Sequence, residues 1–166
     1  KKFQQYFQRD GKVVGFKYGG TSYQILIHEV KVYVQAYAAY CVLAARRHLT
    51  ELPKVLVIDI GGFTVDYMIL RYGRLEKEHV DSLESGVICL YGRIRAAIRQ
   101  KYSIALDEED IDNIILGKNT GYMQELKERV REVTIGYVTE LHGTFRELGI
   151  DYRTTQTVFM GGGAIL

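Results

Sequence analysis

The stretch that decides the fold reads Val57-Ile58-Asp59-Ile60-Gly61-Gly62-Phe63-Thr64-Val65-Asp66. The apolar run at residues 55–58 predicts a short strand buried on both faces of a mixed sheet. Gly61-Gly62 then predicts a tight turn whose backbone amides are open, because no Cβ covers them. A carboxylate beside amides that cradle a phosphate requires a cation between them, so Asp59 is a candidate ligand for Mg²⁺, directly or through water. An ordinary hairpin with a capping aspartate explains the same spacing equally well.

A second glycine cluster follows a second short apolar strand. Thr157-Val158-Phe159-Met160 runs directly into Gly161-Gly162-Gly163, so five of the 17 glycines follow the ends of two apolar strands. Open α/β sheets bind ligands at the carboxyl ends of their strands. The two clusters therefore predict a single ligand site.

The rest of the chain alternates between strand and helix patterns. Gly19-Gly20 and Tyr72-Gly73 predict two hairpin turns. The apolar stripes of the later helices are interpreted as surface that faces the core. The expected strands lie at residues 12–18, 22–27, 30–34, 64–71 and 74–82, and the expected helices at residues 35–49, 87–102, 107–116 and 123–148.

The composition excludes several classes of protein. The 166 residues are 47% hydrophobic and 25% charged, as in soluble globular domains and unlike disordered or collagen-like chains. The net charge of +2 gives no support for a surface that binds nucleic acid or a membrane. The longest apolar run, residues 36–45, predicts a buried helix and is shorter than the ~20 residues that span a bilayer. Cys41 and Cys89 stand alone and are interpreted as buried thiols in a reducing cytoplasm.

Three segments resemble one superfamily in the right order. Residues 59–66 resemble the second phosphate motif of the actin, heat-shock chaperone and sugar-kinase superfamily, D-[LIV]-G-G-x-T-x-D. Val32-Tyr33-Val34-Gln35-Ala36-Tyr37-Ala38-Ala39-Tyr40 resembles the strand-to-helix connection before that motif. Val158-Phe159-Met160-Gly161-Gly162-Gly163-Ala164 resembles the adenosine motif. Within the superfamily, the chain is most similar to the bacterial plasmid-segregation actins of the ParM/StbA group.

This resemblance implies an α/β fold of the actin-like, ribonuclease H-like type. We expect a mixed five-stranded sheet flanked by helices, with a small N-terminal β element. Residues 1–166 are then the second, C-terminal lobe of an actin-like ATPase without the first lobe and the C-terminal helix. No D-x-G phosphate motif precedes Gln35, and the chain stops shortly after Gly163. We therefore expect this fragment to be inactive by itself.

The resemblance also implies roles at the phosphates and the metal. Asp59 orders Mg²⁺ and its water shell. The amides of Gly61, Gly62 and Phe63, together with the Thr64 hydroxyl, contact the β- and γ-phosphates of ATP. Asp66 is either a further site residue or a strand residue that bonds the turn.

Further roles are implied at the attacking water and at the nucleoside. Gln35 orients the water that attacks, a task of alignment rather than of proton removal. Many bacterial relatives carry Glu at this position, so Gln35 is a departure within that group. Gly86 lets the backbone pass near the nucleotide, with an ordinary loop-to-helix start as the equal alternative. Gly161, Gly162, Gly163 and Ala164 line the adenosine pocket.

The implied function is an ATPase that polymerises with ATP and Mg²⁺ and drives plasmid or DNA segregation. Its partners would be further copies of itself, and DNA only through an adaptor protein, with no membrane. Two alternatives stay open: a small-molecule kinase of the same superfold and a non-catalytic scaffold that binds nucleotide. Gln35 resembles the water-positioning residue of actin, and no sugar-binding signature is visible, so hydrolysis is favoured.

Overall fold

The computed structural model describes residues 2–151 and 154–166, and the chain divides into two compact units, Lys1–Ala38 and Ala39–Leu166. The first unit contains the helix α1 (Lys2–Gln8), a 3-10 turn η1 (Arg9–Gly11) and a hairpin of β1 (Val14–Tyr18) and β2 (Thr21–Ile25). Gly19 and Gly20 both adopt positive φ, +56° and +81°, as the tight two-residue turn requires. The small N-terminal β element is therefore confirmed.

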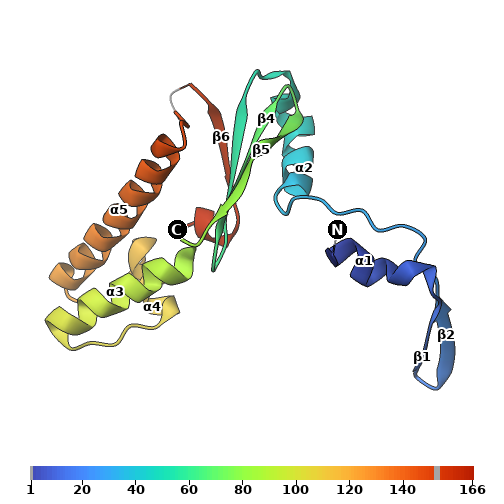
Figure 1. Ribbon diagram of the computed structural model, residues 1–166. Helices are drawn as coiled ribbons and strands as arrows, with labels where there is room; N and C mark the ends of the chain where they lie inside the picture. Colours follow the sequence, from blue (N-terminus) through green and yellow to red (C-terminus); the bar gives the residue numbers. More distant parts are fainter. Residues whose placement is uncertain (1, 152–153) are drawn as a thin grey trace. The chain divides into compact units, whose positions relative to one another are not determined.

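The second unit is built on a mixed sheet in the order β5-β4-β3-β6 (Figure 1). β3 (Val55–Ile60) pairs antiparallel with β4 (Val65–Arg71) and parallel with β6 (Gln156–Met160), while β5 (Arg74–Leu83) pairs with β4. Residues 55–58 are fully buried on both faces of the sheet, which confirms the interpretation of that apolar run.

Helices cover both faces of this sheet (Figure 1). On one side lie α3 (Val87–Tyr102), α4 (Glu108–Ile115) and α5 (Gln124–Glu147), close to the expected bounds. Leu141 and Phe145 of α5 pack with Leu56 and Ile58 of β3 in one apolar cluster. The helix α2 (Tyr37–Arg47), followed by the 3-10 turn η2 (Leu49–Glu51), lies on the opposite side. A last 3-10 turn, η3 (Gly162–Ala164), follows β6.

Three expectations need correction. The expected strand at residues 30–34 is not formed, because these residues pair with neither β1 nor β2. Among the residues described, the mixed sheet of the second unit has four strands rather than five. Cys41 and Cys89 are both free and exposed rather than buried. In α2 only Tyr40 and Ala44 are buried, since one face of an otherwise exposed helix meets the core, and Cys41 lies off that face.

None of the helices in the described part of the chain combines the length and the apolar character needed to cross a lipid bilayer.

The start of α4 is set by a reciprocal cap, which gives a first prediction. The Asp107 side chain accepts from the Asp110 amide at 2.8 Å, and the Asp110 side chain accepts from the Asp107 amide at 3.3 Å. Asp107→Ala leaves that helix end unsatisfied and is expected to lower the free energy of unfolding by about 1 kcal/mol, measured by urea denaturation. Asp107→Ser keeps a capping oxygen and serves as the control; an equal loss in both variants contradicts the role of the cap.

Candidate functional site

The two glycine clusters leave the sheet at the same edge. Because β3 and β6 are parallel and Asp59 lies opposite Met160, the chain that follows each strand emerges beside the other. The sheet topology therefore places the two glycine clusters next to each other.

The first cluster forms a loop whose carbonyl groups cap a helix. The amide of Gly61 donates to the Thr64 carbonyl at 2.9 Å and closes the turn. The helix α3 has no side-chain cap at its start. Instead its first amides donate to the loop: Gly86 to the Phe63 carbonyl at 3.0 Å, Val87 to Gly61 at 3.0 Å and Ile88 to Gly62 at 2.9 Å.

These bonds determine where the loop amides point. The Gly61 carbonyl and the Gly62 amide belong to one planar trans peptide, as do the Gly62 carbonyl and the Phe63 amide. Since both carbonyls face α3, both N–H groups face away from it. Neither N–H has a hydrogen-bond partner among residues 2–151 and 154–166. Two adjacent donors that point to open space form a small binding surface for an anion.

Gly86 lies directly against this loop. A side chain there would overlap the Gly62 carbonyl and the Phe63 backbone. The structure thus places Gly86 as the contact between loop and helix, at the start of α3. The close approach needs a residue without Cβ.

Asp59 provides a buried negative charge beside a second one. Asp59 is 8% exposed, and it lies opposite Asp66 across the β3–β4 pair. Burial raises the pKa of the Asp59 carboxyl, and the charge of Asp66 raises it further. Asp66 accepts a hydrogen bond from the Thr64 hydroxyl at 3.2 Å, so it does bond the turn.

Asp59 and Asp66 suit a cation whose other ligands are water and phosphate oxygens rather than protein side chains. Within the part of the chain that the structure describes, no group of three or more His, Cys, Asp or Glu side chains could hold a metal ion. Mg²⁺ is commonly held by one or two carboxylates together with waters and phosphate oxygens. Asp59 and Asp66 therefore fit Mg²⁺ that arrives with a phosphate ligand, and they do not fit a metal held by the protein alone.

The second cluster packs on the first. Gly161 has φ +87°, and a Cβ there would overlap the Asp59 carboxylate. A Cβ on Gly163 would overlap Val87 and would lie 2.5 Å from the Ile60 side chain. Gly162 has open space around it. Gly161 and Gly163 are thus required for packing against β3, while Gly162 borders an open space next to the two glycine clusters.

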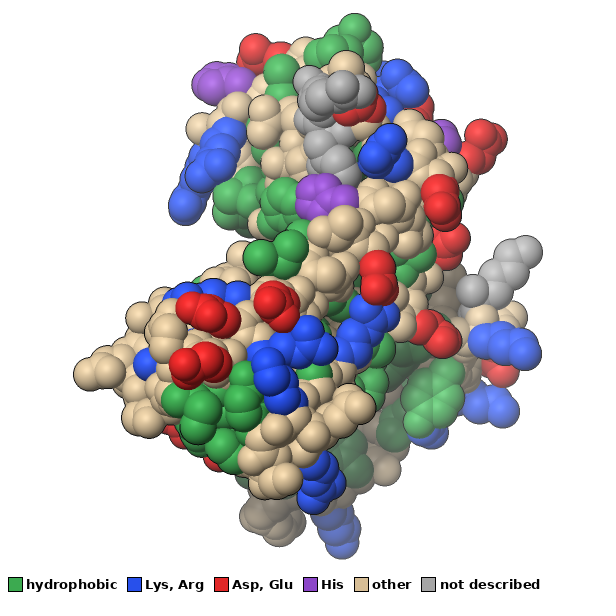
Figure 2. Space-filling model, turned by 90° about the vertical axis from the view of Figure 1, so that its left-hand side faces the viewer, with side chains coloured by type: hydrophobic (Ala, Val, Ile, Leu, Met, Phe, Trp, Pro, Cys, Tyr) green, Lys and Arg blue, Asp and Glu red, His purple; other side chains and the backbone are tan. Residues whose placement is uncertain are grey.

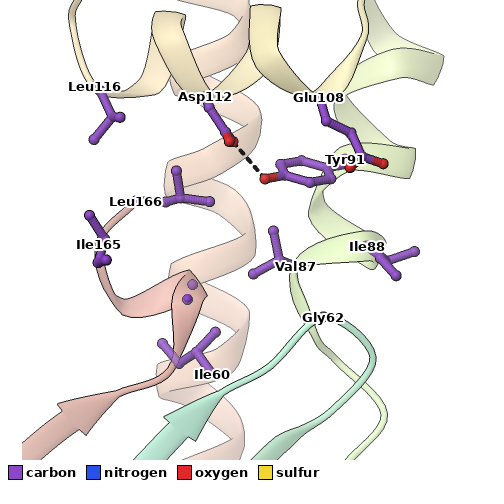
Figure 3. A pocket seen from close by; sticks show the side chains of 12 residues that line it. Ile60, Gly62, Val87, Ile88, Tyr91, Glu108, Asp112, Leu116, Ile165 and Leu166 are labelled. Atoms are coloured by element: carbon purple, nitrogen blue, oxygen red, sulfur yellow. Dashed lines mark hydrogen bonds between the residues drawn. The ribbon is translucent and has the colours of Figure 1, made fainter. Parts of the chain in front are cut away.

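That space is a pocket of about 500 Å³ (Figure 3). Gly62 from the first cluster and Gly162 and Gly163 from the second line it, so the pocket joins the two predicted motifs. Its other walls come from the end of β3, from α3, from α4 and from the last residues of the chain: Ile60, Val87, Ile88, Tyr91, Glu108, Asp112, Leu116, Ile165 and Leu166.

The wall formed by α4 was missing from the sequence prediction. Glu108 and Asp112 of α4 and Leu116, which directly follows it, recur every four residues, a spacing that aligns them along one side of the helix and that could have indicated the wall. In Figure 3 the Tyr91 hydroxyl donates to the Asp112 carboxylate at 2.6 Å. Burial raises the pKa of Tyr91, and the hydrogen bond to Asp112 raises it further, so the hydroxyl stays neutral.

Of the predicted residues in the second unit, Gly62, Gly162 and Gly163 line this pocket, whereas the lining does not include Asp59, Gly61, Phe63, Thr64, Gly86, Gly161 or Ala164. Gln35 is exposed in a turn of the first unit, and its role stays a prediction. Ala164 is exposed and does not belong to the pocket wall. Asp59 and the loop at residues 61–64 pack directly on the glycines instead: a Cβ on Gly161 would meet the Asp59 carboxylate, and a Cβ on Gly86 would meet the Gly62 and Phe63 backbone.

Comparison with known proteins agrees with this arrangement. Residues 57–166 match the family described as "Archaeal actin homologue MreB-like, C-terminal". No curated protein shows significant similarity to the chain.

Solved structures share the fold at low sequence identity. The archaeal actin homologue Ta0583 superposes with a TM-score of 0.69 at 17% identity, over 94% of this chain and 52% of that one. Ta0583 has also been solved in complex with ADP, with a TM-score of 0.65, 17% identity and coverage of 93% and 52%. Apo psk41 ParM superposes with a TM-score of 0.64 at 17% identity, over 97% of this chain and 47% of that one. The Alp12 filament structure superposes with a TM-score of 0.66 at 16% identity, over 99% of this chain and 52% of that one. The chain thus spans about half the length of these structures.

Proposed function

Because the chain belongs to the archaeal actin homologue family of MreB-like C-terminal domains, we propose that its pocket binds ATP with Mg²⁺ as one half of an actin-like nucleotide cleft. In the whole protein, the proposed activity is ATP hydrolysis coupled to the formation of filaments. The proposed biological role is the segregation of plasmid or other DNA.

One observation carries this proposal: Gly62, Gly162 and Gly163 line a pocket of about 500 Å³, next to two loop amides without a partner in the described part of the chain and next to the buried Asp59, which lies opposite Asp66. That volume lies within the ~300–1,000 Å³ usual for small-ligand sites. Unpartnered amides suit phosphate oxygens, and the carboxylates suit the cation that accompanies a polyphosphate. An apolar wall with a few polar groups suits a base and a sugar.

Each group of residues has a proposed task. The amides of Gly62 and Phe63 hold the phosphates. Asp59 and Asp66 hold Mg²⁺ through its waters, and the cation reduces the electrostatic repulsion between the phosphates and the carboxylates. Gly162 leaves room for the nucleoside against Ile88 and Leu116. Gln35 orients the attacking water, which requires alignment alone.

The proposed partners are further copies of the same protein. The fold is shared with Alp12, whose structure is that of a filament. On the face drawn in Figure 2, acidic and basic side chains are interspersed rather than gathered into one basic area. This supports contact with DNA through an adaptor rather than directly. A cytoplasmic location, where ATP is abundant, follows from the proposed activity.

Nucleotide binding by the 166-residue chain is the direct test. We expect ATP with Mg²⁺ to raise the melting temperature, and ATP with a chelator to do so less, in a thermal denaturation experiment. At ten times the dissociation constant, binding stabilises by about 1.4 kcal/mol, or about 3–6 °C for a chain of this size. No shift with any nucleoside triphosphate contradicts the proposal.

The rate of ATP hydrolysis distinguishes a chain that supplies half of the nucleotide cleft from a complete ATPase. We expect the isolated chain to release phosphate from ATP far more slowly than an intact actin-like ATPase. Equal turnover contradicts the half-cleft assignment. Sedimentation of the full-length protein with ATP then distinguishes a filament from a small-molecule kinase, which releases ADP only when a phosphate acceptor is present.

A further inference from the structure

A tyrosine on α5 is connected to the phosphate loop through a single peptide group. Tyr137 is 6% exposed, and its hydroxyl donates to the Ser85 carbonyl. The Ser85 carbonyl and the Gly86 amide belong to the same planar peptide. That amide donates in turn to the Phe63 carbonyl of the loop at 3.0 Å. One rigid unit therefore joins the tyrosine hydroxyl on one side to the loop on the other.

The orientation of this peptide matters for the whole loop. Gly86 is the residue that precedes α3, and the next two amides of the helix hold the carbonyls of Gly61 and Gly62. A rotation of the 85–86 peptide would move the start of α3, and with it the two carbonyls whose opposite N–H groups are the proposed phosphate donors. Glycine at position 86 leaves this rotation without the restraint of a side chain.

The tyrosine ring is itself held in place. The Arg93 guanidinium lies 5.9 Å from the centre of the ring and pairs with Glu140 at 2.6 Å, which joins α3 to α5. Burial raises the pKa of Tyr137, so the hydroxyl keeps its proton and remains a donor at neutral pH. The donor is thus fixed in both position and protonation.

We propose that Tyr137 is a positioning residue that orients the loop at residues 61–64 for the phosphates of the nucleotide. The proposal rests on the proposed function, because it assigns the loop to phosphate binding. Tyr137 contacts neither the phosphates nor the metal. It acts through the 85–86 peptide, so we expect it to affect the binding of the phosphates. We expect no effect on the binding of the nucleoside, which we place in the pocket beyond Gly162.

The test is Tyr137→Phe in the 166-residue chain, which removes only the hydroxyl. Tyr102→Phe is the matched control, because the buried Tyr102 hydroxyl, on the same side of the sheet, has no hydrogen-bond partner in the described structure. Calorimetry measures binding of ATP with Mg²⁺ and, separately, of adenosine. Assigned NMR spectra of the ligand-free proteins measure the amide signals and hydrogen exchange of Gly62 and Phe63.

For Tyr137→Phe we expect ATP affinity about 3- to 10-fold lower, as for the loss of one buried hydrogen bond, with adenosine affinity unchanged. The Gly62 and Phe63 amide signals shift and exchange faster, while Tyr102→Phe leaves all of these unchanged. A general structural defect would instead weaken adenosine as well, and that outcome overturns the proposal. So does a Tyr137→Phe chain with unaltered loop amides.

The two proposals fail in different ways. If the wild-type chain binds no nucleotide, the proposed function fails, and the loop amides still report whether Tyr137 orients the loop. If the wild-type chain binds ATP and Tyr137→Phe binds it equally well, the positioning role alone is wrong.

Discussion

Alanine at position 86 is expected to lower the free energy of unfolding by about 3 kcal/mol and to abolish measurable ATP binding. The added Cβ would overlap the Gly62 carbonyl and the Phe63 backbone. Neither atom is the free end of a flexible side chain, so the loop and the start of α3 must separate. Overpacking of this kind costs about 1–3 kcal/mol, and a clash with backbone lies at the upper end.

A second glycine of the same helix provides the control. Gly92 is exposed in the interior of α3 and has no atom near the position that a Cβ would take. Gly92→Ala is therefore expected to raise stability by about 0.5–1 kcal/mol through helix propensity. Urea denaturation of both variants decides the matter, and a change of the same sign in both would show that position 86 is an ordinary helix start.

Asparagine at position 59 is expected to make the protein more stable and less able to bind its ligand. The change keeps the shape of the side chain and removes a buried charge that lies opposite Asp66. Without that charge, we expect the Mg²⁺-dependent affinity for ATP to fall about 10- to 100-fold, the size of effect usual for groups that support a metal. Calorimetry with Mg²⁺ and with a chelator measures the difference; equal affinity of both proteins for ATP with Mg²⁺ would remove Asp59 from the site.

The gain in stability has a defined pH dependence. Burial, and then Asp66, raises the pKa of Asp59 above its ordinary value of 3.8, so the folded protein holds this proton more tightly than the unfolded chain. The stability that this contributes is complete below pH 3.8 and is lost as the pH rises through the folded-state pKa. Asp59→Asn stays neutral throughout. Its advantage over the wild type is therefore small in acid and larger at neutral pH.

An exposed acidic residue on the same sheet is the control for charge alone. Glu78 lies on the exposed part of β5, and Glu78→Gln changes the net charge by the same amount. It is expected to leave both the melting temperature and ATP affinity nearly unchanged. If Glu78→Gln stabilises the chain as much as Asp59→Asn, the effect comes from overall charge rather than from burial beside Asp66.

Most elements of the second unit could be predicted from local patterns. The apolar run at residues 55–58, the Tyr72-Gly73 turn and the helical stripes each have a period or a turn signal that is read within a few residues. The strand expected at residues 30–34 failed because a strand needs a hydrogen-bonded neighbour, which no local pattern supplies. The exposure of Cys41 depends on which face of α2 meets the sheet, and an Ala-rich helix has little amphipathic pattern to reveal it.

The sequence by itself determined that two glycine clusters follow two apolar strands and that Asp59 lies at the tip of the first, because apolar runs and glycine turns are local patterns. Only the tertiary structure decided what surrounds them. Parallel pairing of β3 with β6 brings the clusters together, capping of α3 by the loop carbonyls turns the Gly62 and Phe63 amides outward, and α4 completes the pocket with Glu108 and Asp112. These features join residues far apart in the chain, and their geometry depends on packing that no short stretch of sequence contains.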